Sequence, residues 1–212
     1  MPELPDITVY LEALERRVVG QVLEKIQILD LFVLRTARPP IGSICGERVR
    51  ELRRLGKRIA FGFADGKWLV LHLMIAGRLQ WAEAGGKAAK GVGRNALAQF
   101  TFPTGTLTLT EAGTKRRASL HLLADESELA AHDRRGIDVF GATGEEFQAA
   151  LVEGNHTLKR ALTDPRHFSG IGNAYSDEIL HAARLSPVTL AQRLSRDEVA
   201  RLHTATKKVL SE

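Results

Sequence analysis

The sequence predicts an α+β fold, with one N-terminal helix, then several antiparallel strands in a sandwich or barrel, then an all-helical part. Apolar residues repeat at helical spacing before about residue 20. Short β-like runs alternate with turn residues from about residue 21 to 124, and helical spacing returns from about residue 144. Because the strands precede the helices instead of alternating with them, we expect two successive regions with a boundary near residues 125–145.

The first predicted helix follows Pro5. Asp6 is suited to cap its N-terminus, and apolar side chains recur at helical spacing from Ile7 to Val18. Gly20 is expected to end the helix, since glycine readily adopts the left-handed conformation that follows many helices.

Five β-like runs support the strand prediction. Asp65-Gly66 and Pro103-Thr104-Gly105 separate neighbouring runs and are typical of turns between paired strands. Residues 84–95 are rich in glycine and lysine and are expected to form an exposed, mobile loop. The runs are VLEKIQIL (22–29), RIAFGF (58–63), KWLVLHLM (67–74), LAQFTF (97–102) and TLTLT (106–110).

The last third of the chain is predicted to be helical. Thr143 and Glu146 have the spacing of a capping box, as have Ser195 and Glu198. The predicted helices begin after Thr143, cover 157–163 and 174–183, and run from Ser195 to about residue 210.

The composition narrows the class of protein. The net charge is +5 and the isoelectric point is about 9.6, which favours a polyanionic partner such as nucleic acid. No apolar run approaches the roughly 20 residues that span a bilayer, and the N-terminus lacks a signal-peptide pattern, so we expect a cytoplasmic protein without membrane contact. Cys45 is the only cysteine, which excludes an intramolecular disulfide and a cysteine-rich zinc site. We expect Cys45 to be buried and inert.

Pro2 and Glu3 are the first candidates for chemistry. Removal of Met1 would leave Pro2 with a secondary amine, and an α-amino group titrates roughly two pH units below lysine, so a useful fraction is unprotonated at neutral pH. Such an amine can attack an aldehyde-level sugar carbon and form an iminium ion, which permits β-elimination of a phosphate. Glu3 lies next to it and is suited to move protons. The alternative is that Pro2 and Pro5 only stiffen the terminus.

Two further segments indicate phosphate binding. Lys57, at the start of a β run, is suited to hold a phosphate, and an ordinary surface lysine is the alternative. Residues 170–173 separate two helical patterns. Gly170 and Gly172 permit close backbone approach, the following helix offers free N–H groups, and Asn173 adds a side-chain amide. The alternative here is a simple turn between helices.

Five motifs together resemble the bacterial formamidopyrimidine-DNA glycosylase / endonuclease VIII family, in the same order and over nearly the whole chain. This resemblance implies an N-terminal β-sandwich domain, residues 1–130, and a helical domain, residues 131–212, that carries a helix–two-turn–helix motif. It also implies a bacterial, nucleoid-associated monomer that binds double-stranded DNA containing oxidised bases or abasic sites. The motifs are PELPD (2–6), LGKR (55–58), HLMIAGRL (72–79), RGIDVFG (135–141) and LKRALTDPRHFSGIGNAYSDEIL (158–180).

For catalysis, the resemblance implies that Pro2 is the nucleophile, that Glu3 is the general acid and that Lys57 contacts DNA near the lesion. The expected activity is that of a bifunctional DNA glycosylase/AP lyase of base excision repair. It removes oxidised bases, with Leu4 favouring purines such as 8-oxoguanine and formamidopyrimidines, and nicks the strand by β,δ-elimination through a Pro2 Schiff base. The lesion nucleotide has to leave the base stack to reach Pro2.

For DNA binding, the resemblance implies that Lys159, Asn173 and the turn around Gly172 contact backbone phosphates. Met74 matches one of the side chains that fill the gap left by a flipped base, and a core methionine is the alternative.

The chain departs from the family pattern in residues 111–119. Arg116 or Arg117 is expected to fill the gap in the DNA, whereas Ala118 replaces an aromatic wedge, which predicts weaker scanning or a different lesion preference.

A second departure is that the family commonly continues into a C-terminal zinc finger with four cysteines, whereas this chain has one cysteine. We interpret the chain as truncated before that finger, and a naturally short relative is the alternative. We expect no cofactor in this chain, and zinc only if a missing C-terminal four-cysteine finger exists.

Two other functions stay open, namely a non-catalytic or weakly active damaged-DNA-binding relative, and an RNA-binding protein that keeps only the helix–two-turn–helix motif. If Met1 remains attached, Pro2 is an amide and cannot react.

Overall fold

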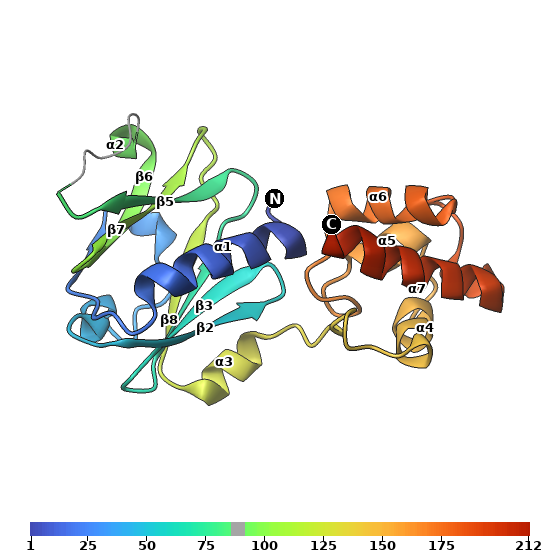
Figure 1. Ribbon diagram of the computed structural model, residues 1–212, viewed down its shortest axis with the longest axis horizontal. Coiled ribbons are helices and arrows are strands. Elements are labelled where there is room, and N and C mark those ends of the chain that lie inside the picture. Colours follow the sequence, from blue (N-terminus) through green and yellow to red (C-terminus); the bar gives the residue numbers. More distant parts are fainter. Residues whose placement is uncertain (86–91) are drawn as a thin grey trace. The chain divides into compact units, whose positions relative to one another are not determined.

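The computed structural model describes residues 1–85 and 92–212, which form two compact units (Figure 1). The units are not continuous in sequence. The first contains Met1–Pro2, Ile7–Arg54 and Arg58–His132. The second contains Glu3–Asp6, Leu55–Lys57 and Asp133–Glu212. Two short segments of the N-terminal half therefore belong to the helical unit, and they carry Glu3 and Lys57.

The first unit contains two four-stranded antiparallel sheets, with the strand orders β1-β6-β7-β5 and β2-β3-β4-β8. The predicted α+β class, with a sandwich before helices, is confirmed. Both turns predicted between neighbouring runs are found, one joining β3 to β4 and the other joining β6 to β7. The strands are β1 (Lys25–Ile28), β2 (Val49–Leu55), β3 (Arg58–Phe63), β4 (Trp68–His72), β5 (Gly77–Glu83), β6 (Ala96–Phe102), β7 (Gly105–Glu111) and β8 (Ser119–Leu123).

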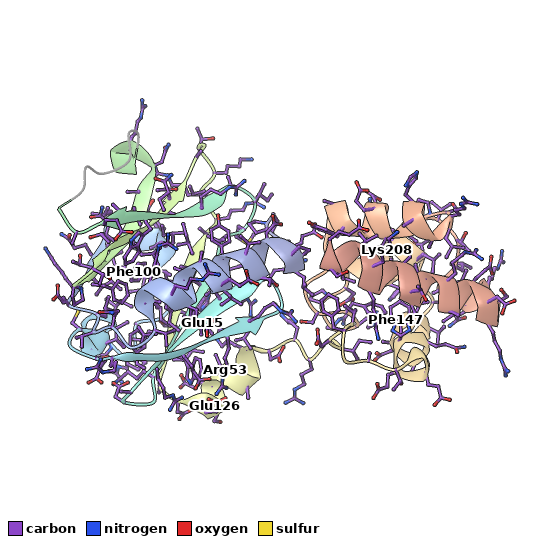
Figure 2. All side chains as sticks on the ribbon, viewed as in Figure 1. Glu15, Arg53, Phe100, Glu126, Phe147 and Lys208 are labelled. Carbon is purple, nitrogen blue, oxygen red and sulfur yellow. The ribbon has the colours of Figure 1, made fainter. Side chains whose placement is uncertain are left out.

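The core of this unit takes apolar side chains from both sheets and from α1 (Leu4–Val18). Ile59 and Leu71 from one sheet, Leu109 from the other and Ile7 from the helix are each 0% exposed. Full burial of such a side chain contributes roughly 1.5–3 kcal/mol. Figure 2 shows Phe100, on β6, among these side chains.

Strands β2, β5 and β8 were not predicted. β2 illustrates the reason, because its sequence VRELRRL has three arginines and no simple alternation. Arg53 nevertheless packs its guanidinium 4.4 Å from the ring centroid of Trp68 and pairs with Glu126 at 2.5 Å (Figure 2). Long charged side chains can cover apolar surface while their heads stay in water, so the pattern of a half-buried strand is hidden.

Helix α1 begins two residues before the predicted cap. Asp6 lies inside its first turn, where its Oδ2 accepts a hydrogen bond from the Glu3 backbone N–H at 2.9 Å. Gly20 follows the helix with φ +81°, as expected for its end.

The second unit is helical, with α4 (Gly144–Val152), α5 (Leu158–Thr163), α6 (Asn173–Ala183) and α7 (Arg196–Ser211). Both predicted capping boxes are confirmed, at Thr143 with Glu146 and at Ser195 with Glu198. Each such cap contributes about 1 kcal/mol.

The helical unit has its own core, in which Phe147 (labelled in Figure 2), Phe168 and Leu202 are fully buried. Leu4 is part of this core, so the first turn of α1 is anchored in the helical unit. No helix in the described part of the chain is long and apolar enough to cross a membrane.

Two smaller predictions are wrong. Cys45 is exposed, because the neighbouring Ile44, at the end of a short 3₁₀ helix, takes the buried position. Within the predicted loop 84–95, residues Val92–Asn95 form a short helix, α2, and residues 86–91 lie outside the described part. A further helix, α3 (Glu126–His132), follows β8 and was not predicted.

Candidate functional site

The carboxylate of Glu3 binds the N-terminus of α6 within the helical unit. Its Oε2 accepts hydrogen bonds from the backbone N–H groups of Gly172 at 2.6 Å and Tyr175 at 3.2 Å, and its Oε1 accepts one from Ala174 at 3.0 Å. Glu3 is only 3% exposed, and burial of a carboxylate is tolerable when its oxygens are hydrogen-bonded in this way. The first amides of a helix lack partners within the helix, so Glu3 acts as the cap of α6.

The two glycines of this turn have separate reasons to be glycine. Gly170 has φ +88°, and its carbonyl accepts a hydrogen bond from the Leu4 N–H at 2.9 Å. Gly172 has no left-handed backbone, but a Cβ added to it would lie 2.5 Å from Oε1 of Glu3. The absence of a side chain at Gly172 therefore makes room for the Glu3 carboxylate.

These contacts correct the prediction of free N–H groups at this turn. The amides of Gly172, Ala174 and Tyr175 are bound to Glu3 and are not available to a DNA phosphate. The glycines and the start of the helix could be recognised in the sequence. The sequence gave no signal that the carboxylate of Glu3, 169 positions before Gly172, binds these amides in place of a DNA phosphate.

Lys57 contacts the same turn at the peptide group between Ile171 and Gly172. Its Nζ donates a hydrogen bond to the carbonyl of Ile171 at 2.9 Å, next to the amide of Gly172 that binds Glu3. Burial lowers the pKa of the Lys57 ammonium, and the charge of Glu3 opposes that shift. Lys57 lies in the turn between β2 and β3, where Gly56 has φ +61°, and directly precedes β3, as predicted from the β run that begins at Arg58.

Pro2 is buried and directly precedes Glu3 in the chain. Met1 is present and 42% exposed. In this form the nitrogen of Pro2 belongs to a peptide bond and has no nucleophilic lone pair. The chemistry predicted for Pro2 therefore begins only after Met1 has been removed.

Two residues predicted to bind phosphate lie on the surface of the helical unit. Asn173 is exposed at the first position of α6. Lys159, on α5, is engaged with Asp177 of α6, whose two carboxylate oxygens both lie 2.7 Å from its Nζ. The side chains of this pair are 37% and 57% exposed, so water screens the interaction strongly. Asp177 is a functional candidate that sequence reasoning missed.

Met74 lies in the turn between β4 and β5. It is half-buried and has φ +52°, a conformation that a residue with a long side chain rarely adopts. Its neighbour Ile75 is 64% exposed. The position is a turn and not a place in the hydrophobic core, so the alternative of a core methionine is not supported. Backbone strain of this kind often accompanies functional positions.

Glu111 forms hydrogen bonds to the backbone at the other end of the segment 111–119. Its buried Oε2 accepts hydrogen bonds from the backbone N–H groups of Arg117 at 2.7 Å and Ala118 at 2.8 Å. Ala118, which was predicted to replace an aromatic wedge, is 3% exposed and belongs to the sandwich core, so a side chain at this position points inward. Arg116 and Arg117 are exposed, and Arg116 pairs with Asp30 at 3.1 Å.

The part of the chain that the structure describes offers no site that fits a bound zinc ion. Among the described residues no group of three or more His, Cys, Asp or Glu side chains could hold a metal. A four-cysteine site also needs more than the one cysteine of this chain.

Comparison with known proteins gives a match along the whole chain. Residues 1–140 match the model of the formamidopyrimidine-DNA glycosylase N-terminal domain, and residues 140–212 match the model of the formamidopyrimidine-DNA glycosylase H2TH domain. The chain is 31% identical to a formamidopyrimidine-DNA glycosylase of Thermus thermophilus over 214 residues, covering 100% of this chain and 75% of the relative. It is 29% identical to one of Arabidopsis thaliana over 231 residues, covering 99% of this chain and 57% of the relative.

Solved structures agree in fold. The chain is similar to the Lactococcus lactis Fpg in complex with DNA containing an abasic site, with a TM-score of 0.87 and 21% identity over 99% of this chain and 78% of that one. It is equally similar, at 22% identity and the same coverage, to MutM in complex with DNA containing carbocyclic 8-oxo-G. At this identity the likeness establishes the fold.

Proposed function

Because the chain belongs to the formamidopyrimidine-DNA glycosylase family, we propose that it is a bifunctional DNA glycosylase/AP lyase of base excision repair. Its substrate is double-stranded DNA with oxidised bases, chiefly purines such as 8-oxoguanine and formamidopyrimidines, or with abasic sites. The observation that supports this most is the set of three amides that fixes Glu3 beside Pro2 in the chain. A proton-transferring group needs such fixed placement more than a structural surface residue does.

The first half of the reaction removes the base. Once Met1 is gone, the lone pair of the Pro2 nitrogen attacks C1′ of the flipped nucleotide, and the glycosidic bond breaks with its electrons going to the base. The proton that the attacking amine loses neutralises the departing base. The sugar ring then opens. The bond between C1′ and O4′ breaks, Glu3 supplies a proton to O4′, and a cationic iminium forms between C1′ and the nitrogen of Pro2.

The second half cleaves the strand. The iminium acidifies the C2′–H bond, so loss of that proton expels the 3′ phosphate by β-elimination, and a second elimination expels the 5′ phosphate. Water then hydrolyses the iminium and returns the free amine of Pro2. Lys57 contributes a half-buried cation beside Glu3 that suits the phosphate next to the lesion.

Contacts to the rest of the duplex are assigned to exposed and half-buried groups. Asn173 and Lys159 meet backbone phosphates, and Lys159 exchanges its bond to Asp177 for one to the DNA. Met74 and Arg117 enter the gap left by the flipped base, since the Arg116 guanidinium is held by Asp30 and by the carbonyl of Arg94. Gly172 has a different role from the one the sequence suggested, since it positions Glu3.

Borohydride trapping tests the proposal. A duplex with one abasic site is incubated with the protein lacking Met1 and with sodium borohydride, which reduces the iminium to a stable bond. The expected result is a covalent protein–DNA adduct whose mass maps to Pro2. Acetylation of the N-terminal amine should abolish the adduct, and Glu3→Gln should slow its formation on oxidised bases while leaving duplex binding in place.

A non-catalytic damaged-DNA-binding relative is the alternative. The segment 111–119 favours it, because it contains no aromatic side chain that could act as a wedge and offset unstacking. Tight binding to the damaged duplex without any adduct from the Met1-free protein would establish this alternative in place of the enzyme.

A further inference from the structure

The sandwich unit has a pocket of about 830 Å³. The residues that hold Glu3 belong to the other unit and do not line this pocket. Its lining includes Asp30, Phe32, Arg94 and Arg116. Ligand sites for small molecules commonly measure about 300–1,000 Å³, so the pocket has room for one nucleotide.

Asp30 contacts both the aromatic residue and one of the arginines that line this pocket. Its Oδ1 accepts a hydrogen bond from the Phe32 N–H at 3.0 Å, and its Oδ2 pairs with Nη1 of Arg116 at 3.1 Å. Nη2 of Arg116 also donates to the carbonyl of Arg94 at 3.0 Å. The guanidinium is therefore held at two points, and the loop that carries it is fixed to the turn that carries Phe32.

Phe32 is 82% exposed although it stands on a short 3₁₀ helix, Leu31–Val33, that is anchored by the buried Val33. An exposed aromatic ring that lines one pocket with two arginines combines a stacking surface with positive charge. This is the chemistry that binds an unpaired nucleobase together with its phosphate, because every base has a π-face and the phosphate is anionic.

We propose that this pocket receives an unstacked base of the bound DNA, with Phe32 stacking on the base and Arg94 and Arg116 meeting its phosphate or acceptor edge. The proposal rests on the proposed function, because it requires that the protein binds DNA. It adds a recognition site for a base outside the Pro2–Glu3 centre.

The test uses 2-aminopurine, a fluorescent base whose emission falls when it stacks on an aromatic ring. One duplex carries 2-aminopurine opposite a reduced abasic site, which leaves it unpaired and prevents cleavage, and a second duplex carries it paired with thymine. We expect the protein to quench the unpaired base, and Phe32→Ala to lose that quenching and bind this duplex about tenfold more weakly. Affinity for the fully paired duplex should change less than twofold.

Leu31→Ala is the matched control, because Leu31 is also 82% exposed on the same 3₁₀ helix. It should behave as the unmodified protein does, and Phe32→Tyr should restore both quenching and affinity. Equal quenching and equal affinity in Phe32→Ala would overturn the pocket assignment while leaving the proposed enzyme intact. Failure of the unmodified protein to bind either duplex would contradict the proposed function itself and remove the basis of the pocket assignment with it.

Discussion

Oε1 of Glu3 lies 2.5 Å from the point where a Cβ atom on Gly172 would stand, and Cδ of Glu3 lies 2.6 Å from it. The two residues are far apart in the sequence, yet the missing side chain of one is the space that the other fills. The same Glu3 carboxylate accepts a hydrogen bond from the Gly172 amide. Any side chain at position 172 therefore acts directly on the proposed proton donor.

Gly172→Ala should expel Glu3 from its position. Loss of hydrogen bonds to a buried charged group costs roughly 2–4 kcal/mol, so urea denaturation should show a free energy of unfolding lower by about that amount. Excision of an oxidised base should fall by roughly 100-fold, in line with the loss of a positioned proton-transfer group. Gly42→Ala is the control, because no atom lies within 4 Å of its added Cβ and its φ is not positive. Unchanged excision in Gly172→Ala would contradict the role given to this contact.

The ion pair between Lys159 and Asp177 predicts how the affinity for DNA depends on salt concentration. If Lys159 gives up Asp177 for a phosphate, Lys159→Ala should reduce the slope of log Kd against log salt by about one and weaken binding to all duplexes alike. Asp177→Asn should instead strengthen DNA binding at low salt, because it removes the competing carboxylate. Fluorescence anisotropy between low and moderate salt measures both. Equal slopes in the original protein and Lys159→Ala would place Lys159 outside the DNA contact.

How much of this could be predicted from the sequence depended on how local the cause was. Caps such as Thr143 with Glu146 involve four consecutive residues, and both predicted capping boxes were found. The role of Gly172 was misjudged, because the anion at its amide comes from Glu3 and only the folded chain brings the two together. The burial of Ala118 was not predicted, because the sequence does not show that Glu111 binds its backbone and turns its methyl group into the core.

Ala118→Phe provides a direct check of that correction. An aromatic ring at a position that is 3% exposed has to displace its packed neighbours, and such overpacking costs typically 1–3 kcal/mol. The melting temperature should fall, and lesion excision should show no gain. The neighbouring exposed Arg117→Phe is the control and should leave the free energy of unfolding within about 0.5 kcal/mol. An unchanged melting temperature with faster excision in Ala118→Phe would restore the wedge interpretation.

His121, on β8, predicts a dependence of stability on pH. Burial lowers its pKa to about 4, and the nearby charges of His132, Arg58 and Arg35 act in the same direction. The ring of His121 also meets that of His132 edge-on, with centroids 5.0 Å apart. In the unfolded chain a histidine takes up its proton near pH 6.5, so between that value and about pH 4 the unfolded state binds more protons than the folded state. The free energy of unfolding should therefore fall as the pH is lowered through this window and level off for this group below it.

In His121→Gln the slope of the free energy of unfolding against pH should be smaller by up to one proton, whereas His181→Gln, on the exposed face of α6, should leave that slope unchanged. Urea titrations at several pH values measure the slope, and parallel slopes for the original protein and His121→Gln would show that this side chain is not the source of acid sensitivity.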